Sequence, residues 1–479
     1  MKEITMLTVS KAGELLEKKE ISSVELTKAC LDRIRKTHNL NTLITLDEKN
    51  ALNQAKISDK RRGANKPLSS IDGIPATLKD IILTEGLRTT AASKMLDNFI
   101  PSYDATVTKK LKDSGAVILG KNNCDAWAHG ASTEHSDFGH TKNPHDETRV
   151  PGGSSGGSAA SVAANQSIYS IGTDTGGSIR QPASFCGIVG LKPTYGRVSR
   201  HGLIAMASSL DCPGPITKTV KDSAILMEIL AGNDKKDSTT SKEKPQKYTE
   251  FLKKGIKGLK IGLPKEYFSK GLQKEVSDKI KNAVQKLESA GAEIKEVSLP
   301  HTKYTVPAYY IIQPAEVSSN LGRYDGIKYG HSVKTANLLD AYLKSREEGF
   351  GDEAKRRIML GTYTLSSGYY EAYYAKATKV RSLIKKDFDD IFEKVDVLIT
   401  PTAPTTAFKI GEKEKDPIQM YLADIFTAGP SLAGVPAISI PAGFDNNNLP
   451  IGMQVIAPHF REDLLFQVGS LYENQKEKE

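Results

Sequence analysis

Two segments rich in glycine and serine carry the residues best suited to chemistry. The first is Pro151-Gly-Gly-Ser-Ser-Gly-Gly-Ser158, and the second is Ile171-Gly-Thr-Asp-Thr-Gly-Gly-Ser-Ile-Arg180. The small residues between them predict a helix and a strand, which would bring backbone N–H groups and hydroxyls of both segments to one point. Flexible linkers would have no use for Asp174 and Arg180. We therefore interpret the two segments as parts of one site.

Two familiar sites built on glycine-rich segments do not fit. A phosphate-binding loop ends in Gly-Lys-Ser/Thr and a dinucleotide site has Gly-x-Gly-x-x-Gly spacing, and neither segment has either pattern. Residues 152–156 do match the Gly-x-Ser-x-Gly elbow of α/β-hydrolases, with Ser154 as the nucleophile. That elbow directly follows a buried strand, whereas residues 143–150 are polar and lead into Pro151. This pattern disfavours the α/β-hydrolase interpretation.

The elements that must position the site follow from hydrophobic patterning. Residues 71–83 form an apolar run that holds one lysine, Lys79, which predicts a buried strand with a charge inside it. A helix followed by a strand, as expected over 105–120, is typical of doubly wound α/β proteins. The other predicted helices are 9–34 and 276–287, and the other predicted strands are 43–46, 293–299, 395–400 and a hairpin of 437–444 with 449–457.

The composition of the chain limits the class of protein to which it can belong. The 479 residues are 38% apolar and 26% charged, which indicates a soluble globular protein rather than a disordered, collagenous or coiled-coil chain. The net charge is +9, and the basic residues that concentrate over 235–265 are interleaved with glutamates, which favours a solvated surface over a nucleic-acid patch. The four cysteines form no Cys-x-x-Cys pair and the N-terminus lacks a signal-peptide pattern. We therefore expect reduced thiols and a cytoplasmic location.

The order of the motifs resembles the amidase signature family. Lys79 lies in Gly-Ile-Pro-Ala-Thr-Leu-Lys-Asp, Ser154 in Gly-Gly-Ser-Ser-Gly-Gly-Ser, and Ser178 in Gly-Thr-Asp-Thr-Gly-Gly-Ser-Ile-Arg. The match continues through Pro182-Ala-Ser184 and residues 190–199 and covers nearly the whole chain. The resemblance implies a single large α/β/α domain over 1–479, with a central mixed β-sheet covered by helices.

Within this domain we expect four regions. They are a helical N-terminal region at about 1–60, a signature core at about 70–220, an exposed polar excursion at about 232–250, and the remainder of the fold with the donor-pocket residues at about 255–470.

The resemblance also implies a Ser-cisSer-Lys triad of Ser178, Ser154 and Lys79. An amide carbon is a poor electrophile, so its hydrolysis needs a nucleophile, a base and a cage for the oxyanion. Ser178 would attack, and Ser154 would relay the proton to a neutral Lys79. Burial among apolar neighbours would lower the pKa of Lys79 from its ordinary value of about 10.4. The oxyanion hole would consist of the backbone N–H groups of Thr175, Gly176 and Gly177, together with that of Ser178.

The second half of the chain narrows the expected activity. Residues 318–326, 355–374 and 424–427 are similar to the glutaminase-subunit family of tRNA-dependent amidotransferases. The glutaminase in that family supplies ammonia for converting Glu-tRNA(Gln) to Gln-tRNA(Gln), and Asp-tRNA(Asn) is a second acceptor to be tested. The alternative is a stand-alone amidase acting on a free small-molecule amide. A catalytically inactive scaffold protein is disfavoured by the intact triad.

The amide donor would then be glutamine, which is a zwitterion. Its recognition calls for a cation facing the carboxylate and an anion facing the ammonium group. The resemblance implies Arg357 and Asp424 for these roles, with Tyr309 close by. Arg356 and Tyr310 are alternatives one position away.

The partners and cofactors are likewise implied by the resemblance. A heterotrimer is expected, in which the kinase and tRNA-binding subunit would use ATP and Mg²⁺ and a second, small subunit would stabilise the complex. This chain itself would need no cofactor and no metal. The spacing of His129, His135, His140 and His145 is not that of a helical zinc site.

Three residues depart from the usual family pattern. Trp127 and His129 lie in Trp-Ala-His-Gly-Ala-Ser, where Phe-Ala-Met-Gly-Ser-Ser is common, and Cys212 takes the place of a common glutamine. We expect these departures to affect pocket walls or packing and to leave the triad unchanged.

Overall fold

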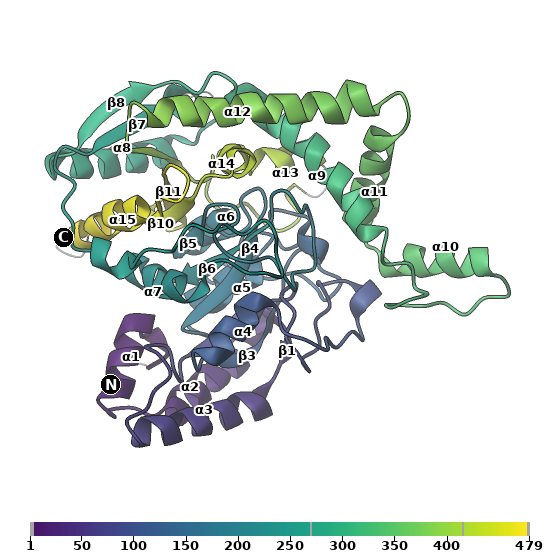
Figure 1. Ribbon diagram of the computed structural model, residues 1–479, viewed down its shortest axis with the longest axis horizontal. Helices are drawn as coiled ribbons and strands as arrows, with labels where there is room; N and C mark the ends of the chain where they lie inside the picture. Colours follow the sequence, from purple (N-terminus) through teal and green to yellow (C-terminus); the bar gives the residue numbers. More distant parts are fainter. Residues whose placement is uncertain (1–3, 269–270, 414–415, 477–479) are drawn as a thin grey trace.

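One mixed β-sheet organises the molecule, and helices flank it (Figure 1). The computed structural model describes residues 4–268, 271–413 and 416–476. These residues form eleven strands in the order β1-β3-β2-β4-β6-β5-β10-β11-β9-β7-β8. The strands are β1 Leu43–Leu46, β2 Pro75–Lys79, β3 Val117–Asn122, β4 Tyr169–Asp174, β5 Val189–Lys192, β6 Cys212–Thr217, β7 Lys260–Pro264, β8 Glu293–Val297, β9 Val397–Pro401, β10 Ala437–Phe444 and β11 Pro450–Ile456. The expected α/β fold with a mixed sheet is confirmed.

Strand direction places Lys79 and the second glycine-rich segment at the same end of the central strands. Strand β2 is parallel to both β3 and β4, so Lys79 and Asp174 end neighbouring strands at the same edge. Strand β6 runs antiparallel to β4, and Cys212 at its start pairs with Asp174 at the end of β4. In sheets that contain parallel strands, the carboxyl edge is where loops gather functional groups.

Fifteen α-helices occur in the described part of the chain. They are α1 Val9–Glu17, α2 Ser23–Lys36, α3 Glu48–Gly63, α4 Thr106–Asp113, α5 Gly156–Ala163, α6 Arg180–Cys186, α7 Val220–Leu230, α8 Lys274–Ser289, α9 Thr305–Leu321, α10 Leu338–Gly349, α11 Asp352–Leu365, α12 Lys376–Phe392, α13 Pro417–Leu422, α14 Ala428–Ala433 and α15 Glu462–Lys476. Helix α9 packs against α11, α12 and α14, while α6 packs against β5, β10 and β11. Buried apolar side chains fill the space between the sheet and these helices.

The predicted single helix over 9–34 is wrong, because the chain forms α1 and α2 there. Lys19 adopts a left-handed conformation with φ 59°, which interrupts the helix. Ser22 then opens α2 with a capping box: its hydroxyl accepts a hydrogen bond from the Glu25 N–H at 3.1 Å, and its own N–H donates to the Glu25 carboxylate at 2.8 Å. The two helices therefore begin and end on local signals that apolar spacing does not record.

The other predicted elements are found with shifts of a few residues at their ends, including the β10–β11 hairpin. Helices α3, α6, α7 and α9–α15 and strands β5–β7 were not predicted. The N-terminal helical region and the polar C-terminal tail extend into residues 1–3 and 477–479, which lie outside the described residues. Among the described residues, no helix combines the length and apolarity needed to span a bilayer.

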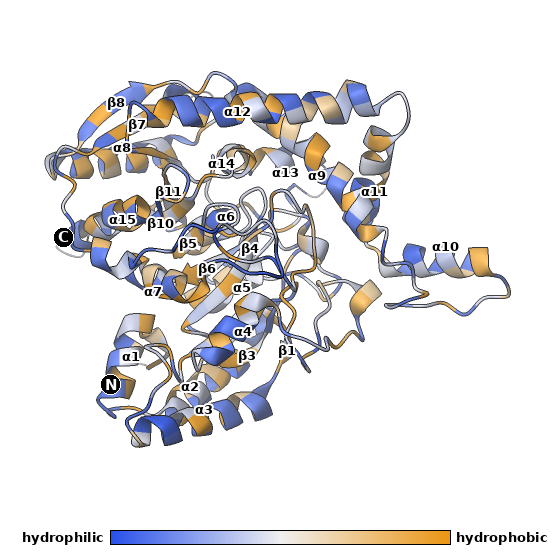
Figure 2. Ribbon diagram, in the orientation of Figure 1, coloured by the Kyte–Doolittle hydropathy of each residue, from blue (hydrophilic) through white to orange (hydrophobic). Residues whose placement is uncertain are grey.

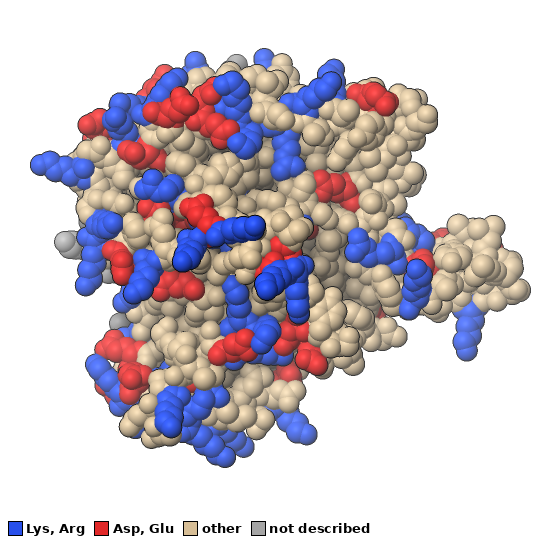
Figure 3. All heavy atoms as spheres, viewed as in Figure 1, with Lys and Arg blue, Asp and Glu red and all other residues tan. Residues whose placement is uncertain are grey.

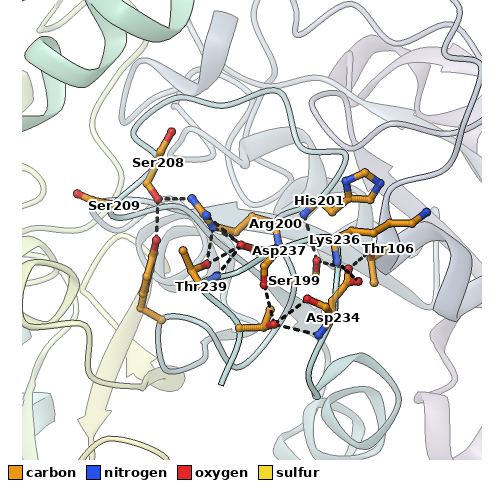
Figure 4. A network of polar contacts seen from close by, with 12 residues as sticks. Thr106, Ser199, Arg200, His201, Ser208, Ser209, Asp234, Lys236, Asp237 and Thr239 are labelled. Atoms are coloured by element: carbon orange, nitrogen blue, oxygen red, sulfur yellow. Dashed lines mark hydrogen bonds and ion pairs between the residues drawn. The ribbon is translucent and has the colours of Figure 1, made fainter. Parts of the chain in front are cut away.

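The polar segment 232–250 lies against the loop at 199–209 (Figure 4). The Arg200 guanidinium pairs with the Asp237 carboxylate at 3.0 Å and also donates to the Ser208 carbonyl oxygen. Most side chains of the segment are exposed, whereas those of Asp237, Thr240 and Tyr248 are buried. On the face seen in Figure 3, basic and acidic side chains are interspersed, and no large patch of one sign covers it.

Candidate active site

Lys79 and Ser154 are in direct contact inside the protein. The Lys79 Nζ atom lies 2.7 Å from the Ser154 Oγ atom and 3.0 Å from the Thr173 Oγ1 atom. Lys79 ends β2, and Ser154 follows a cis peptide bond from Gly153. Both Lys79 and Ser154 are 0% exposed, so water cannot compete for the contact. The expected cis peptide bond before Ser154 is present.

Burial changes the basicity of Lys79. It lowers the pKa of the Lys79 amine to about 8, because a low dielectric disfavours the ammonium form. The nearby acids Asp125, Asp211 and Asp174 oppose this shift, but their effect is smaller than that of burial. A substantial fraction of the amine is therefore neutral near physiological pH and can accept a proton.

Ser178 lies beside this pair. The Ser155 N–H donates to the Ser178 carbonyl oxygen at 3.1 Å, which joins the two glycine-rich segments next to Ser154. Ser178 is 7% exposed and lines a cavity together with Arg357 and Asp424. Ser178 therefore lies next to the Lys79–Ser154 pair through the backbone and lines the cavity, while its role as the third member of a triad stays a prediction.

The loop that carries Ser178 is anchored by a buried ion pair. Both Asp174 and Arg180 are fully buried, and two Arg180 nitrogens lie 2.9 Å from the two Asp174 oxygens. Asp174 also accepts the Ile179 N–H at 3.2 Å. A bidentate arginine–carboxylate pair has a fixed geometry, so it holds the start and the end of the turn at residues 175–178 in one arrangement.

The backbone of this turn presents donors without partners. In the described part of the chain, none of the backbone N–H groups of residues 175–178 donates a hydrogen bond to a protein acceptor. Side chains cannot replace the two glycines here. A Cβ on Gly176 would lie 2.6 Å from the Tyr309 hydroxyl oxygen, and a Cβ on Gly177, whose φ is +151°, would overlap Thr427 Oγ1. Buried N–H groups without acceptors can receive an anionic oxygen.

Arg357 is held in the wall of the same cavity by several contacts. Its guanidinium donates to the Glu353 carboxylate at 2.7 Å and to the Gln313 side-chain oxygen at 2.6 Å. Its central carbon lies 4.8 and 4.7 Å from the ring centroids of Tyr310 and Tyr421. Arg357 is 3% exposed, so its position is set before any ligand arrives.

The alternatives one position away line the same cavity. Arg356 pairs with Glu353 but its side chain is 42% exposed, so Arg357 is the arginine held by the protein interior. Tyr310 stacks on Tyr421 with ring centroids 3.9 Å apart, whereas the Tyr309 ring lies against Gly176 in the Ser178 turn.

Asp424 is a buried acid without a partner on one oxygen. It is 7% exposed and lines the cavity with Arg357 and Ser178, and its Oδ1 atom has no hydrogen-bond partner among the described residues. Burial raises the pKa of the Asp424 carboxyl to about 8. An incoming ammonium group would supply the missing partner and favour the ionised carboxylate.

Comparison with known proteins places this site in a family. The Amidase family profile matches residues 25–466. The chain belongs to the amidase family. The A subunit of glutamyl-tRNA(Gln) amidotransferase from Caldanaerobacter subterraneus subsp. tengcongensis is 54% identical over 475 residues, which cover 98% of this chain and 96% of the relative. Its counterpart from Carboxydothermus hydrogenoformans is 53% identical over 477 residues, which cover 99% of this chain and 98% of the relative.

Solved amidase structures share the fold along nearly the whole chain. The crystal structure of the glutamyl-tRNA(Gln) amidotransferase A subunit from Thermotoga maritima matches with a TM-score of 0.82 and 44% identity, covering 98% of this chain and 94% of that one. The native peptide amidase of Stenotrophomonas maltophilia matches with a TM-score of 0.83 and 29% identity, covering 98% and 97%. The amidase fold thus occurs in proteins that are named for different activities.

The departures from the amidase pattern lie in packed positions. Trp127 is buried with its ring centroid 4.6 Å from that of Tyr324 and 5.4 Å from that of Phe350. His129 is fully buried, and burial lowers its pKa well below the ordinary value, so its ring is neutral. Cys212 is buried at the start of β6. Among the described residues, no three His, Cys, Asp or Glu side chains gather as metal ligands.

Sequence reasoning missed four residues around the amidase site. Glu353 lies four residues before Arg357 on α11, and this ion-pair spacing is a signal that was available in the sequence. Thr173 lies in its motif without an expected role. Gln313 and Tyr421 reach Arg357 from α9 and α13, and no local pattern connects these segments.

Proposed function

We propose that this chain is the glutaminase, or A, subunit of a glutamyl-tRNA(Gln) amidotransferase. The observation that carries the proposal is a buried lysine that contacts a serine beside Ser178, in a cavity that also presents Arg357 and Asp424. The relatives that are 52–54% identical over nearly their whole length bear this name. The reaction is hydrolysis of the glutamine side-chain amide to glutamate and ammonia.

In the proposed mechanism, Ser178, Ser154 and Lys79 act as a unit. The Ser178 Oγ atom attacks the amide carbon while its proton passes through the Ser154 hydroxyl to the neutral Lys79 amine. The oxygen that becomes negative is received by the N–H groups of Thr175, Gly176, Gly177 and Ser178. The proton then returns through Ser154 to the leaving nitrogen, so ammonia departs and a glutamyl ester remains on Ser178. Water cleaves that ester by the same proton route.

The charged groups of the donor pocket match a free amino acid that carries an amide. Arg357 would bind the α-carboxylate and Asp424 the α-ammonium group, with the Tyr309 ring closing the space against Gly176. The contacts of Arg357 with Glu353 and Gln313 support this assignment, because they orient the guanidinium in advance. Little of the binding energy is then lost to ordering the arginine side chain.

The proposed assembly is a cytoplasmic heterotrimer of this chain with two partners. The kinase and tRNA-binding subunit would phosphorylate the acylated tRNA with ATP and Mg²⁺ and would use the ammonia released here, while the small subunit would stabilise the complex. Glu-tRNA(Gln) is the proposed acceptor. We propose Asp-tRNA(Asn) as a second acceptor to be tested with the intact complex.

An exposed apolar surface supports assembly with another subunit, and we propose the kinase subunit as its partner. Helix α10 projects from the body of the molecule in Figure 1, and its outer end is apolar in Figure 2. Leu339 is 66% exposed and Met359 on α11 is 72% exposed. The other large exposed side chains of this surface are Leu338, Leu343, Leu360, Tyr363, Tyr369, Tyr370 and Tyr373. Exposed large apolar side chains that gather on consecutive elements of the chain mark sites of protein association.

A pair of variants tests this surface. Leu339→Asp combined with Met359→Asp should abolish co-purification with the kinase subunit, because two charges would have to be buried in the contact. Leu68→Asp is the matched control, since Leu68 is 53% exposed outside this surface. Loss of the complex with the control variant, or its retention with the double variant, would contradict the assignment.

Glutaminase assays of the chain alone and with its partners test the proposed function. The proposed glutaminase should release ammonia from glutamine, with a rate that rises when both partners and acylated tRNA are present. The alternative is a stand-alone amidase, which the likeness to a peptide amidase structure supports. Such an enzyme would hydrolyse small amides equally fast without partners and would show no preference for glutamine.

A further inference from the structure

Asp211 lies just before strand β6, the neighbour of β4 in the sheet, and contacts the turn that carries Ser178. It directly precedes β6 and therefore lies across from Thr175, which directly follows β4. The Thr175 hydroxyl donates to the Asp211 Oδ1 atom at 2.7 Å. Asp211 is only 6% exposed, so the hydrogen bond is sheltered from water. A charged acceptor in a sheltered position makes this a strong hydrogen bond.

The same carboxylate also shapes the wall of the donor cavity. Asp211 accepts the Met206 N–H at 3.0 Å and the Ala207 N–H at 3.2 Å. Met206 lines the cavity that contains Ser178, Arg357 and Asp424. One carboxylate thus joins the first residue of the Ser178 turn to the wall that faces the substrate.

The segment around Asp211 is itself held from outside. The Ser209 N–H and hydroxyl donate to Glu316 on α9 at 2.9 and 2.5 Å, and Arg381 on α12 donates to the Ser209 carbonyl oxygen at 3.0 Å. Figure 4 shows Ser208 joined to Arg200, which in turn pairs with Asp237 of the polar segment 232–250. Contacts from two helices and a loop therefore fix Ser208 and Ser209, which lie just before Asp211 in the chain.

We propose that Asp211 is a positioning residue for the oxyanion hole, acting through the Thr175 hydroxyl. The N–H groups of residues 175–178 stabilise an oxyanion only if they point to one place before the reaction starts. The Asp174–Arg180 pair joins the two ends of the turn, and the Asp211–Thr175 hydrogen bond adds a separate contact at its first residue. The inference rests on the proposed function, because it assigns this turn to the oxyanion.

Thr175 is the better position for the decisive substitution. Asp211 also contributes negative charge near Lys79, so Asp211→Asn changes both the hydrogen bond and the electrostatics of the base. Valine has nearly the same shape as threonine, so Thr175→Val replaces the hydroxyl with a methyl group and changes little else. Thr175→Ser keeps the hydroxyl and is the matched control.

The experiment measures kcat and KM for glutamine in the assembled complex. Thr175→Val should lower kcat by about 10- to 100-fold, the cost of a small misplacement of reacting groups, with KM nearly unchanged. Thr175→Ser should restore most of kcat. Asp211→Ala should lower kcat as well, and adding Thr175→Val to it should cause little further loss, because both changes remove one hydrogen bond. Thermal melts of each variant show whether the fold is intact.

The possible results separate this inference from the proposed function. A wild-type kcat in folded Thr175→Val, a change confined to KM, or losses that multiply in the double variant would each overturn the role of Asp211. Ser178→Ala is assayed in parallel. If it keeps glutaminase activity, the proposed function fails, whereas loss of activity in Ser178→Ala with no effect of Thr175→Val contradicts only the positioning role.

Discussion

The Lys79 Nζ atom lies 2.7 Å from the Ser154 Oγ atom, and neither residue is exposed. Among the described residues Lys79 forms no ion pair, so the contact joins an amine of lowered basicity to a neutral hydroxyl. Such a pair is suited to proton transfer, because no ion pair of Lys79 has to be broken before its amine accepts the proton. This pair and the cavity next to it determine how the chain should respond to substitution and to pH.

Replacement of the nucleophile should abolish the reaction. Ser178→Ala should reduce glutaminase activity by more than about 10³-fold and leave the complex assembled, since Ser178 contributes little to the core. Ser154→Ala added to Ser178→Ala should cause scarcely any further loss, because the triad acts as a unit. Mass spectrometry of the enzyme quenched during turnover should find the glutamyl ester on residue 178. An ester on another residue would refute the assignment.

Ammonia supplied from outside should bypass the lost nucleophile. A complex that carries Ser178→Ala should still amidate Glu-tRNA when ammonium salt replaces glutamine, because the proposed partner needs only ammonia. Product is measured as Gln-tRNA at equal total nitrogen donor. Failure of ammonium to restore product, when the same salt serves the unmodified complex, would contradict the division of the reaction between two sites.

The role of Lys79 as a base predicts that kcat increases with pH. The pKa of Lys79 is about 8, so kcat should rise with pH through about 8, where the amine becomes neutral, instead of near the ordinary value of about 10.4. Lys79→Arg should be nearly as inactive as Lys79→Ala, because a guanidinium keeps its charge and accepts no proton. The measurement is kcat at saturating glutamine over a pH series. Substantial activity in assembled Lys79→Arg would show that charge, not basicity, is what this position supplies.

Glutamine affinity should increase with pH for a separate reason. The pKa of Asp424 is about 8, so at pH 6 most of the carboxyl is protonated in the empty pocket and cannot pair with the ammonium group of glutamine. Binding should therefore tighten as the pH rises from 6 towards 8, by at most about tenfold per pH unit. Calorimetry with the Ser178→Ala variant measures binding without turnover. Asp424→Asn should bind weakly at every pH, and a pH-independent affinity in the parent would contradict the role of Asp424.

Substitution of Arg357 and of Arg356 should affect KM for glutamine to different extents. Arg357→Gln should raise KM for glutamine by about 10- to 100-fold, because it removes a charged hydrogen bond to the α-carboxylate. Arg356→Gln should raise KM less, since that side chain lines the cavity but is 42% exposed and is not held by the protein interior. Steady-state kinetics of both variants decide the assignment. A larger effect at position 356 would transfer the carboxylate-binding role to Arg356.

The proposed nucleophile and base could be inferred from local sequence, because these residues lie in motifs. Lys79 stands in an apolar strand, and the two glycine-rich segments carry Ser154 and Ser178 with the spacing that brings backbone donors together. Most strands of the sheet were found for the same reason, since apolar runs record burial directly, but β5, β6 and β7 were not predicted. The break between α1 and α2 was missed, because it depends on the left-handed Lys19 and the Ser22 cap, which apolar spacing does not report.

The donor pocket depended on contacts between distant segments. Arg357 is oriented by Gln313 from α9 and by Tyr421 from α13, and Asp424 acquires its raised pKa only through burial in the assembled fold. Asp211 and Thr175 become neighbours because β6 runs antiparallel to β4. The sequence by itself determined which groups can act as nucleophile and base, since residue type sets chemical reactivity. Only the tertiary structure decided their basicity, their orientation and their partners, because these depend on burial and on distances across the fold.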